Sequence, residues 1–145
     1  MDFFTAMDVS SSAMTAERTR MNMISSNLAN ANSTRTAEGG PYKRKDAVFS
    51  AAPMASKFNA ALNRLSQKDP TGVAVVQITE DQNPPRLQYD PAHPDADAQG
   101  YVALPNVNVV EEMADMISAT RAYEANVTAA QAAKSMALKT LELGR

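Results

Sequence analysis

The N-terminal part of the chain carries apolar residues at the spacing of a helix seam. Most of them recur every seven positions, so they lie on one narrow stripe of a helix. Asp2 is a suitable N-cap residue, and the pattern predicts a helix from there to about Asn30. The stripe contains Met7, Met14, Met21, Ile24 and Leu28.

The C-terminal part repeats this pattern more strongly. Its apolar residues follow one another in alternating steps of three and four positions, and Lys134 is the single charged exception. Asn108, followed three residues later by Glu111, predicts the start of a helix, and Gly144 predicts its end. The stripe contains Val109, Met113, Met116, Thr120, Tyr123, Val127, Ala130, Ala137 and Leu141.

Turns rich in glycine and proline divide the middle of the chain into short β-prone runs. The strongest turn signals lie at 39–41, 69–72, 83–85 and 91–100. The runs between them predict strands at 42–49, 73–79, 86–89 and 100–104. We expect 73–79 to pair with 86–89 across the proline-containing loop. Phe58, Leu62 and Leu65 at helical spacing predict a short helix near 55–67.

These patterns predict an α+β fold, in which long N- and C-terminal helices pair as a coiled-coil-like bundle around a small β-rich middle module. The N-terminal assembly helix and its end occupy 1–35, the middle module 36–105 and the C-terminal assembly helix 106–145. Alanines of the C-terminal helix spread over more than one face, so one partner helix cannot cover them all. We therefore expect other chains to cover the remainder.

Composition and charge narrow the range of partners. A formal net charge of −2 gives no electrostatic reason to expect nucleic acid, and the short basic run at 43–45 is interpreted as a solvated patch. The absence of cysteine excludes disulfides, thiolate zinc sites and cysteine nucleophiles. No segment approaches the roughly 18 apolar residues of a membrane span, and the N-terminus lacks the apolar run of a cleavable secretory signal. We expect no direct membrane span, and an export route, if there is one, that spares the N-terminus.

The chain offers little catalytic chemistry. It has no phosphate-binding loop, dinucleotide fingerprint or HExxH motif, and His93 is its only histidine. Three aspartates, Asp90, Asp95 and Asp97, lie near His93, and the run from Asp95 to Gly100 resembles the opening of a calcium loop. The imitation fails because Asn106 stands where such a loop needs a bidentate glutamate. We therefore predict no catalytic residue, cofactor, metal or small-molecule substrate, and we interpret the aspartates as groups that hold turns.

The predicted N-terminal helix ends in ISSNLANANSTR, which is rich in asparagine. Asn27 and Asn30 stand beside the apolar stripe, and a buried amide costs free energy unless partners satisfy it. One hypothesis is that both amides bond to adjoining chains and fix their register. The alternative is a polar run that ends the helix near Asn32. We predict that the assembly interface consists of Met7, Met14, Met21, Ile24, Asn27, Leu28, Asn30, Val109, Met113, Met116, Tyr123, Val127 and Leu141.

The amino-acid sequences of both ends of the chain resemble those of a known family. ISSNLANANSTR followed by YKR, and the C-terminal NVNVVEEMADMISATRAYEANVTAAQAAKSMALKTLELGR, resemble the flagellar basal-body rod proteins, which belong to the bacterial flagellar axial proteins. The middle segment YDPAHPDADAQGYVALPNV and the short chain are similar to the proximal rod members rather than to the longer distal rod or hook proteins. The resemblance covers about residues 1–50 and 73–145.

This resemblance implies a structural subunit of the proximal rod. Such a subunit is exported without signal cleavage by the flagellar type III apparatus, and it polymerises into the periplasmic drive shaft that carries torque from motor to hook. The implied partners are copies of the chain, rod proteins of the FlgB, FlgF and FlgG types, and the basal-body export apparatus. Two other classes remain open: a soluble coiled-coil adaptor or export chaperone, which the heptads alone permit, and an enzyme seated at His93.

Overall fold

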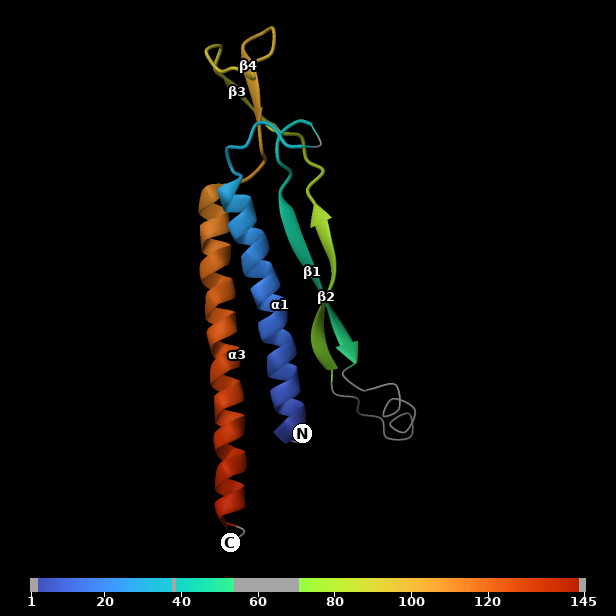
Figure 1. Cartoon of the computed structure of the whole chain (residues 1–145), viewed down its shortest axis with the longest axis vertical. Coiled ribbons are helices and arrows are strands. Elements are labelled where there is room, and N and C mark those ends of the chain that lie inside the picture. The colour runs from blue at the N-terminus through green and yellow to red at the C-terminus, as the bar shows by residue number, and fades with distance from the viewer. Residues whose placement is uncertain (1–2, 38, 54–70, 144–145) are drawn as a thin grey trace.

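The computed structural model describes residues 3–37, 39–53 and 71–143, which form an elongated α+β molecule (Figure 1). The elements in chain order are α1 (Phe3–Ala29), β1 (Lys45–Pro53), β2 (Thr71–Glu80), β3 (Arg86–Tyr89), β4 (Tyr101–Leu104) and α3 (Val109–Leu143). Two long terminal helices flank two small β-sheets, which confirms the predicted fold class. The short helix expected near 55–67 lies outside the described residues.

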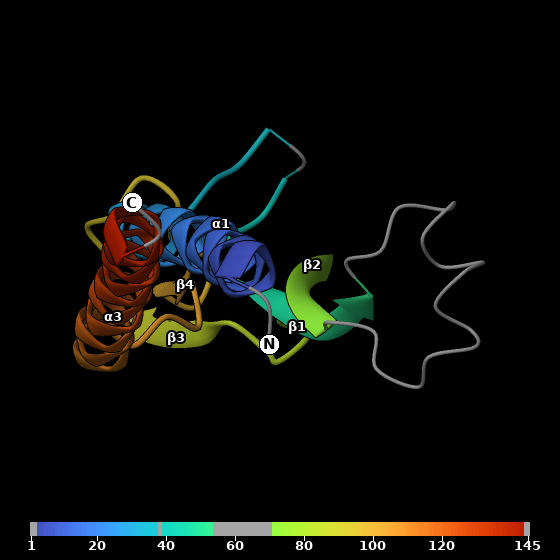
Figure 2. The ribbon, with the colours of Figure 1, turned by 90° about the horizontal axis from the view of Figure 1, so that it is seen from below.

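The helices α1 and α3 lie side by side and run in opposite directions (Figures 1 and 2). Ala16 on α1 and Ala119 on α3 are almost completely buried. Side chains this small let two helix axes approach closely. The Thr120 hydroxyl also lies 3.8 Å from Sδ of Met21, so the two predicted stripes meet at this level.

Local chemistry sets the helix ends. The Asn108 side chain caps α3, because its Oδ1 accepts a hydrogen bond from the Val110 backbone N–H at 3.1 Å. The helix α1 ends at Ala29, within one residue of the expected position. The expected N-cap Asp2 and the expected stop Gly144 lie outside the described residues.

The strands β1 and β2 form an antiparallel ribbon that lies along α1, on the side away from α3 (Figure 2). Their register shifts once, between Val48 and Phe49. Two contacts help to hold the middle of the ribbon on α1. The Ser12 hydroxyl accepts a hydrogen bond from the Val73 backbone N–H at 3.1 Å, and the Arg20 guanidinium lies 5.7 Å from the centroid of the Phe49 ring. The helix α1 is therefore the central element, covered by α3 on one side and by the ribbon on the other.

The strands β3 and β4 form a second antiparallel sheet, beyond the end of the helix pair where α3 begins (Figure 1). The expected pairing of 73–79 with 86–89 is wrong, because β2 pairs with β1 and β3 pairs with β4. The connection between β2 and β3 gives the physical reason. There the Asp81 carboxylate accepts a hydrogen bond from the Asn83 backbone N–H at 2.9 Å, and Pro84 and Pro85 follow. Prolines lack the N–H that would continue a ladder, so the chain leaves the first sheet.

Candidate assembly interface and its polar anchor

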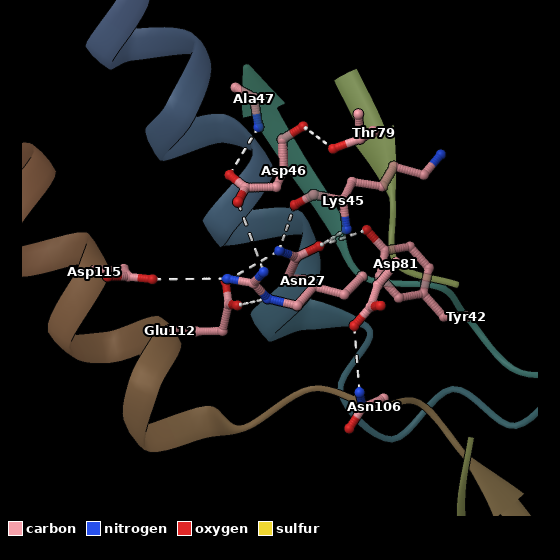
Figure 3. A network of polar contacts seen from close by, with 11 residues as sticks. Asn27, Tyr42, Lys45, Asp46, Ala47, Thr79, Asp81, Asn106, Glu112 and Asp115 are labelled. Atoms are coloured by element: carbon pink, nitrogen blue, oxygen red, sulfur yellow. Dashed lines mark hydrogen bonds and ion pairs between the residues drawn. The ribbon is translucent and has the colours of Figure 1, made fainter. Parts of the chain in front are cut away.

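A buried polar cluster joins α1, α3 and the start of β1 (Figure 3). At its centre is Asn27, which is only 1% exposed. Its Nδ2 donates to the Lys45 backbone carbonyl at 2.8 Å and to Oε2 of Glu112 at 3.0 Å. Its Oδ1 accepts from the Lys45 backbone N–H at 2.9 Å and from the Tyr42 hydroxyl at 3.0 Å. The polar anchor, as we name this cluster, consists of Asn27, Tyr42, Arg44, Lys45 and Glu112.

Glu112 supplies the negative charge of the polar anchor. It lies in the first turn of α3, is 1% exposed, and accepts a hydrogen bond from Nε of Arg44 within an ion pair. The N-terminal end of a helix favours a carboxylate at this place. Burial lowers the pKa of Arg44, but the hydrogen bond and charge of Glu112, together with Asp46 and Asp115, raise it above its ordinary value. The buried carboxylate is therefore matched by a cation that stays charged.

Both donors and both acceptor positions of the Asn27 amide are used within the chain, which favours a role inside the subunit over the hypothesis that this amide bonds to an adjoining chain. Asn30 also bonds internally. Its Nδ2 donates to the Ser26 carbonyl at 2.9 Å, and its Oδ1 accepts from the Ser33 hydroxyl at 3.1 Å. The physical reason is that the chain turns back after α1 and lays the start of β1 against the end of that helix. The amides thus organise a single subunit.

The basic run at 43–45 also differs from the solvated patch that was expected. Lys43 is exposed, but Arg44 pairs with the buried Glu112, and Nζ of Lys45 lies 3.4 Å from a carboxylate oxygen of Glu80. Sequence reasoning missed Arg44, Tyr42 and Glu112 as functional residues. Tyr42 and Arg44 could have been found from the sequence, because YKR follows soon after the asparagine-rich end of the helix. Glu112 could not, because it is separated from Asn27 by 85 positions and only the fold brings the two together.

The structure places the predicted interface residues in two groups. On α1 and in the turn that follows it, Ile24 and Asn27 are buried, and the half-buried positions are Met7, Met14, Met21, Leu28 and Asn30. On α3, Met116, Tyr123 and Val127 are half-buried, whereas the exposed positions are Val109, Met113 and Leu141. The apolar stripe on α1 is thus largely covered within the chain, whereas several apolar side chains of α3 are exposed to solvent.

The exposed apolar residues of α3 gather in two stretches. Near its start, Val110, Met113 and Ile117 follow one another in steps of three and four, which places them on one face. Large apolar side chains grouped on one exposed face are typical of surfaces that contact another protein. A second stretch near the end of the helix contains Met136, Leu138 and Leu141.

The acidic loop between β3 and β4 is held by turn hydrogen bonds. Oδ1 of Asp97 accepts from the backbone N–H groups of Gln99 and Tyr101 at 2.8 and 2.9 Å. Nδ1 of His93 accepts from the Asp95 backbone N–H at 3.1 Å. These bonds support the interpretation of the carboxylates as turn formers. Among the residues that the structure describes, no three or more acidic, histidine or cysteine side chains are grouped so that they could hold a metal ion.

Comparison with known families defines the class of protein. A family model described as "Flagella basal body rod protein" matches residues 7–35, which include Asn27. A second, described as "Flagellar basal body rod FlgEFG protein C-terminal", matches residues 98–143, which include Glu112. The two matches therefore cover both helices that the polar anchor joins.

Curated relatives narrow the class further. The chain is 46% identical over 144 residues to the flagellar basal-body rod protein FlgC of Borreliella burgdorferi, covering 94% of this chain and 93% of the relative. It is 46% identical over 152 residues to FlgC of Bacillus subtilis, and 42% identical over 144 residues to FlgC of Aquifex aeolicus. The first of these two alignments covers 100% of both chains, and the second covers 98% of this chain and 97% of the relative. The chain belongs to the FlgC family of flagellar basal-body rod proteins.

Family membership confirms the resemblance on which the sequence analysis relied. It also confirms the predicted role of a structural subunit in the flagellar basal body, where it assembles with other basal-body rod proteins.

Proposed function

We propose that the chain forms part of the proximal rod and polymerises with other rod proteins into the periplasmic drive shaft that transmits torque from motor to hook. The observation that carries the proposal is the antiparallel pair of α1 and α3, which leaves large apolar residues of α3 exposed in a chain of the rod family. Contact with neighbouring subunits removes this surface from water, and binding that occurs only in the folded state stabilises that state.

The polar anchor supports a mechanical role. It holds α1, α3 and β1 at one level through hydrogen bonds whose directions are fixed, with Asn27 bonded to both of the other elements. Rotation of one element against another would break buried bonds, and an unpaired buried polar group costs about 1–3 kcal/mol. Torque applied to the ribbon or to either helix therefore passes through the whole subunit.

The assembly surfaces follow the predicted division of the chain. We assign assembly to 1–35 and 106–145, and we treat 36–105 as the middle module. Within the assembly segments, the buried and half-buried stripe positions hold α1 on α3. The exposed positions, Val109, Met113 and Leu141, contact neighbouring subunits directly.

The proposed neighbours are copies of the chain, rod proteins of the FlgB, FlgF and FlgG types, and the basal-body export apparatus through which the chain reaches the periplasm without a cleaved signal. Family membership supports this assignment. No described helix is both long and apolar enough to cross a membrane. We assign no catalytic role, because His93, the only histidine, takes part in a loop hydrogen bond and the relatives are rod proteins.

The exposed face near the start of α3 provides the test. Met113→Asp places a charge on that face in a position where the side chain is already exposed, so the purified chain should keep its circular dichroism spectrum and unfolding midpoint. In a strain that lacks the native chain, we expect the variant to be missing from purified basal bodies and the cells to be non-motile.

Ser118→Asp is the matched control, because it adds the same charge to another exposed face of α3. Normal incorporation of Met113→Asp would contradict the assignment of this face. A discrete soluble dimer of the native chain that is absent from basal bodies would favour the coiled-coil adaptor or export chaperone instead.

A further inference from the structure

One partly buried carboxylate lies outside the polar anchor. Glu17 is half-buried on α1, in the series of seven-residue steps that also contains the buried Ser10 and Ile24. Its Oε2 is enclosed, yet no hydrogen-bond partner for this oxygen lies among the residues that the structure describes. No other side-chain oxygen or nitrogen in the described part of the chain is in this condition. An enclosed polar atom without a partner costs free energy, so this oxygen needs an explanation.

The helix α1 does not supply the missing partner. Side chains three and four positions apart are neighbours on a helix, and three of the four such neighbours of Glu17 are apolar: Ala13, Met14 and Met21. The fourth is Arg20, whose guanidinium lies 5.7 Å from the centroid of the Phe49 ring on β1. Arg18 is exposed and, as the next residue in sequence, faces another side of the helix.

The helix α3 does not supply it either. The two helices run in opposite directions, and Met21 of α1 meets Thr120 of α3. Glu17 is one turn before Met21. It therefore lies about one turn beyond Thr120, near the level of Glu124, which is exposed and carries the same charge. Arg121 is exposed as well, and within the described part of the chain no ion pair involves Glu17.

The polar anchor shows how this chain satisfies a buried carboxylate internally. There Glu112 pairs with Arg44 and accepts a hydrogen bond from Asn27. At Glu17 the subunit provides no equivalent cation. Met14 beside it is half-buried, as is Glu17 itself, so the contact between α1 and α3 is not closed at this level. A side chain from outside the subunit can therefore reach the carboxylate.

We infer that Glu17 receives a lysine or arginine side chain from a neighbouring rod protein, an interface that rests on the proposed assembly into the rod. The negative charge of a carboxylate is shared by its two oxygens, so a cation at the open side of Glu17 also compensates the charge on the enclosed Oε2. A cation fits best, because its hydrogen bond to a carboxylate is about twice as strong as a neutral one. Glu17 thereby favours neighbours that present a basic side chain at this level.

Removal of the carboxylate separates assembly from stability. Glu17→Met replaces it with an apolar side chain of similar length, so the purified chain should unfold at the same or a higher urea concentration than the native chain. In a strain that lacks the native chain, the amount of this variant in purified basal bodies should fall at least about tenfold, as expected for the loss of a hydrogen bond to a charged group. Glu17→Gln keeps the shape and loses only the charge, and its incorporation should fall about fivefold.

Glu124→Met and Glu124→Gln are the matched controls, because they make the same changes at an exposed position of α3, and both should be incorporated normally. Normal incorporation of Glu17→Met or of Glu17→Gln would overturn the inference. A purified Glu17→Met chain that is less stable than the native chain would also overturn it, because Glu17 would then act within the subunit. Absence of the native chain from basal bodies would instead contradict the rod function itself.

Charge reversal identifies the partner. Glu17→Lys should abolish motility, because it brings two cations together. Motile revertants should carry a second change, of a lysine or arginine to an acidic residue, in a rod protein. Second changes found only at apolar or small residues of α3 would overturn the inference, because they would show that the substitution is corrected by repacking within the subunit.

Discussion

The helix pair is held differently at its two ends. Where α1 ends and α3 begins, directional hydrogen bonds and an ion pair connect Asn27, Arg44 and Glu112. Further along, the contact between the helices depends on small buried alanines such as Ala133, and beyond it Leu141 is exposed. Hydrogen bonds tolerate little change in geometry, whereas apolar contact is non-directional. The first end therefore fixes the shape of the subunit, and the second end keeps surface for neighbours.

The largest effect is expected when the charge of the polar anchor is removed. Glu112→Ala leaves Arg44 and an amide donor of Asn27 without their buried partner, and breaking a buried ion pair costs about 3–5 kcal/mol. Urea unfolding of the purified chain, followed by circular dichroism, measures this loss. The neighbouring Glu111→Ala, at an exposed position of the same turn, serves as control and should change the free energy of unfolding by less than about 0.5 kcal/mol.

A smaller loss is expected when the central amide is removed. Asn27→Ala deprives the Lys45 backbone and the Tyr42 hydroxyl of partners, which should lower the free energy of unfolding by about 2–3 kcal/mol. The same urea titration measures it, with Asn22→Ala at an exposed position of α1 as the control. Equal stability of the two variants would mean that the polar anchor does not hold the ribbon to the helices.

Enlarging a residue in the apolar contact should destabilise the subunit less. Ala119→Leu forces extra volume between α1 and α3, and overpacking of this kind costs about 1–3 kcal/mol. Ala125→Leu, at an exposed position of the same helix, is the matched control. If both substitutions leave the unfolding midpoint unchanged, the helices do not pack through Ala119.

The smallest effect on stability is expected at the exposed end. Leu141→Asp changes a side chain that is 72% exposed, so the free energy of unfolding should move by less than about 0.5 kcal/mol. Incorporation into basal bodies should nevertheless fall, because the charge lies on a proposed contact surface. A variant that is strongly destabilised as an isolated chain would show that Leu141 belongs to the subunit core.

Much of the architecture could be predicted because it depends on neighbours in sequence. The seven-residue spacing of methionines predicted α1, and Asn108 predicted the start of α3, since helix periodicity and capping act over a few positions. Strand pairing was predicted less well. Segment 73–79 is β-prone, but whether it pairs with the segment before or after it depends on the path of the connections.

The candidate site also combines features that could be predicted from neighbouring residues with features that depend on distant ones. Sequence reasoning identified Asn27 as an amide that needs partners if buried, and the structure buries it. The partners were assigned to adjoining chains because nothing local indicates that Tyr42 and Arg44 return to the end of α1. The polar anchor also needs Glu112, which the sequence analysis treated only as an acidic residue near a helix start.

By itself, the sequence determined the two helices, the β-rich middle and membership of the rod family. Periodicity, capping and the family's sequence motifs are all properties of contiguous residues. Only the tertiary structure decided which strands pair, which face of α3 stays exposed and what satisfies Asn27. These features join residues far apart in the chain. Their contacts stabilise the fold only once the helices have packed and the water around the polar anchor has been displaced.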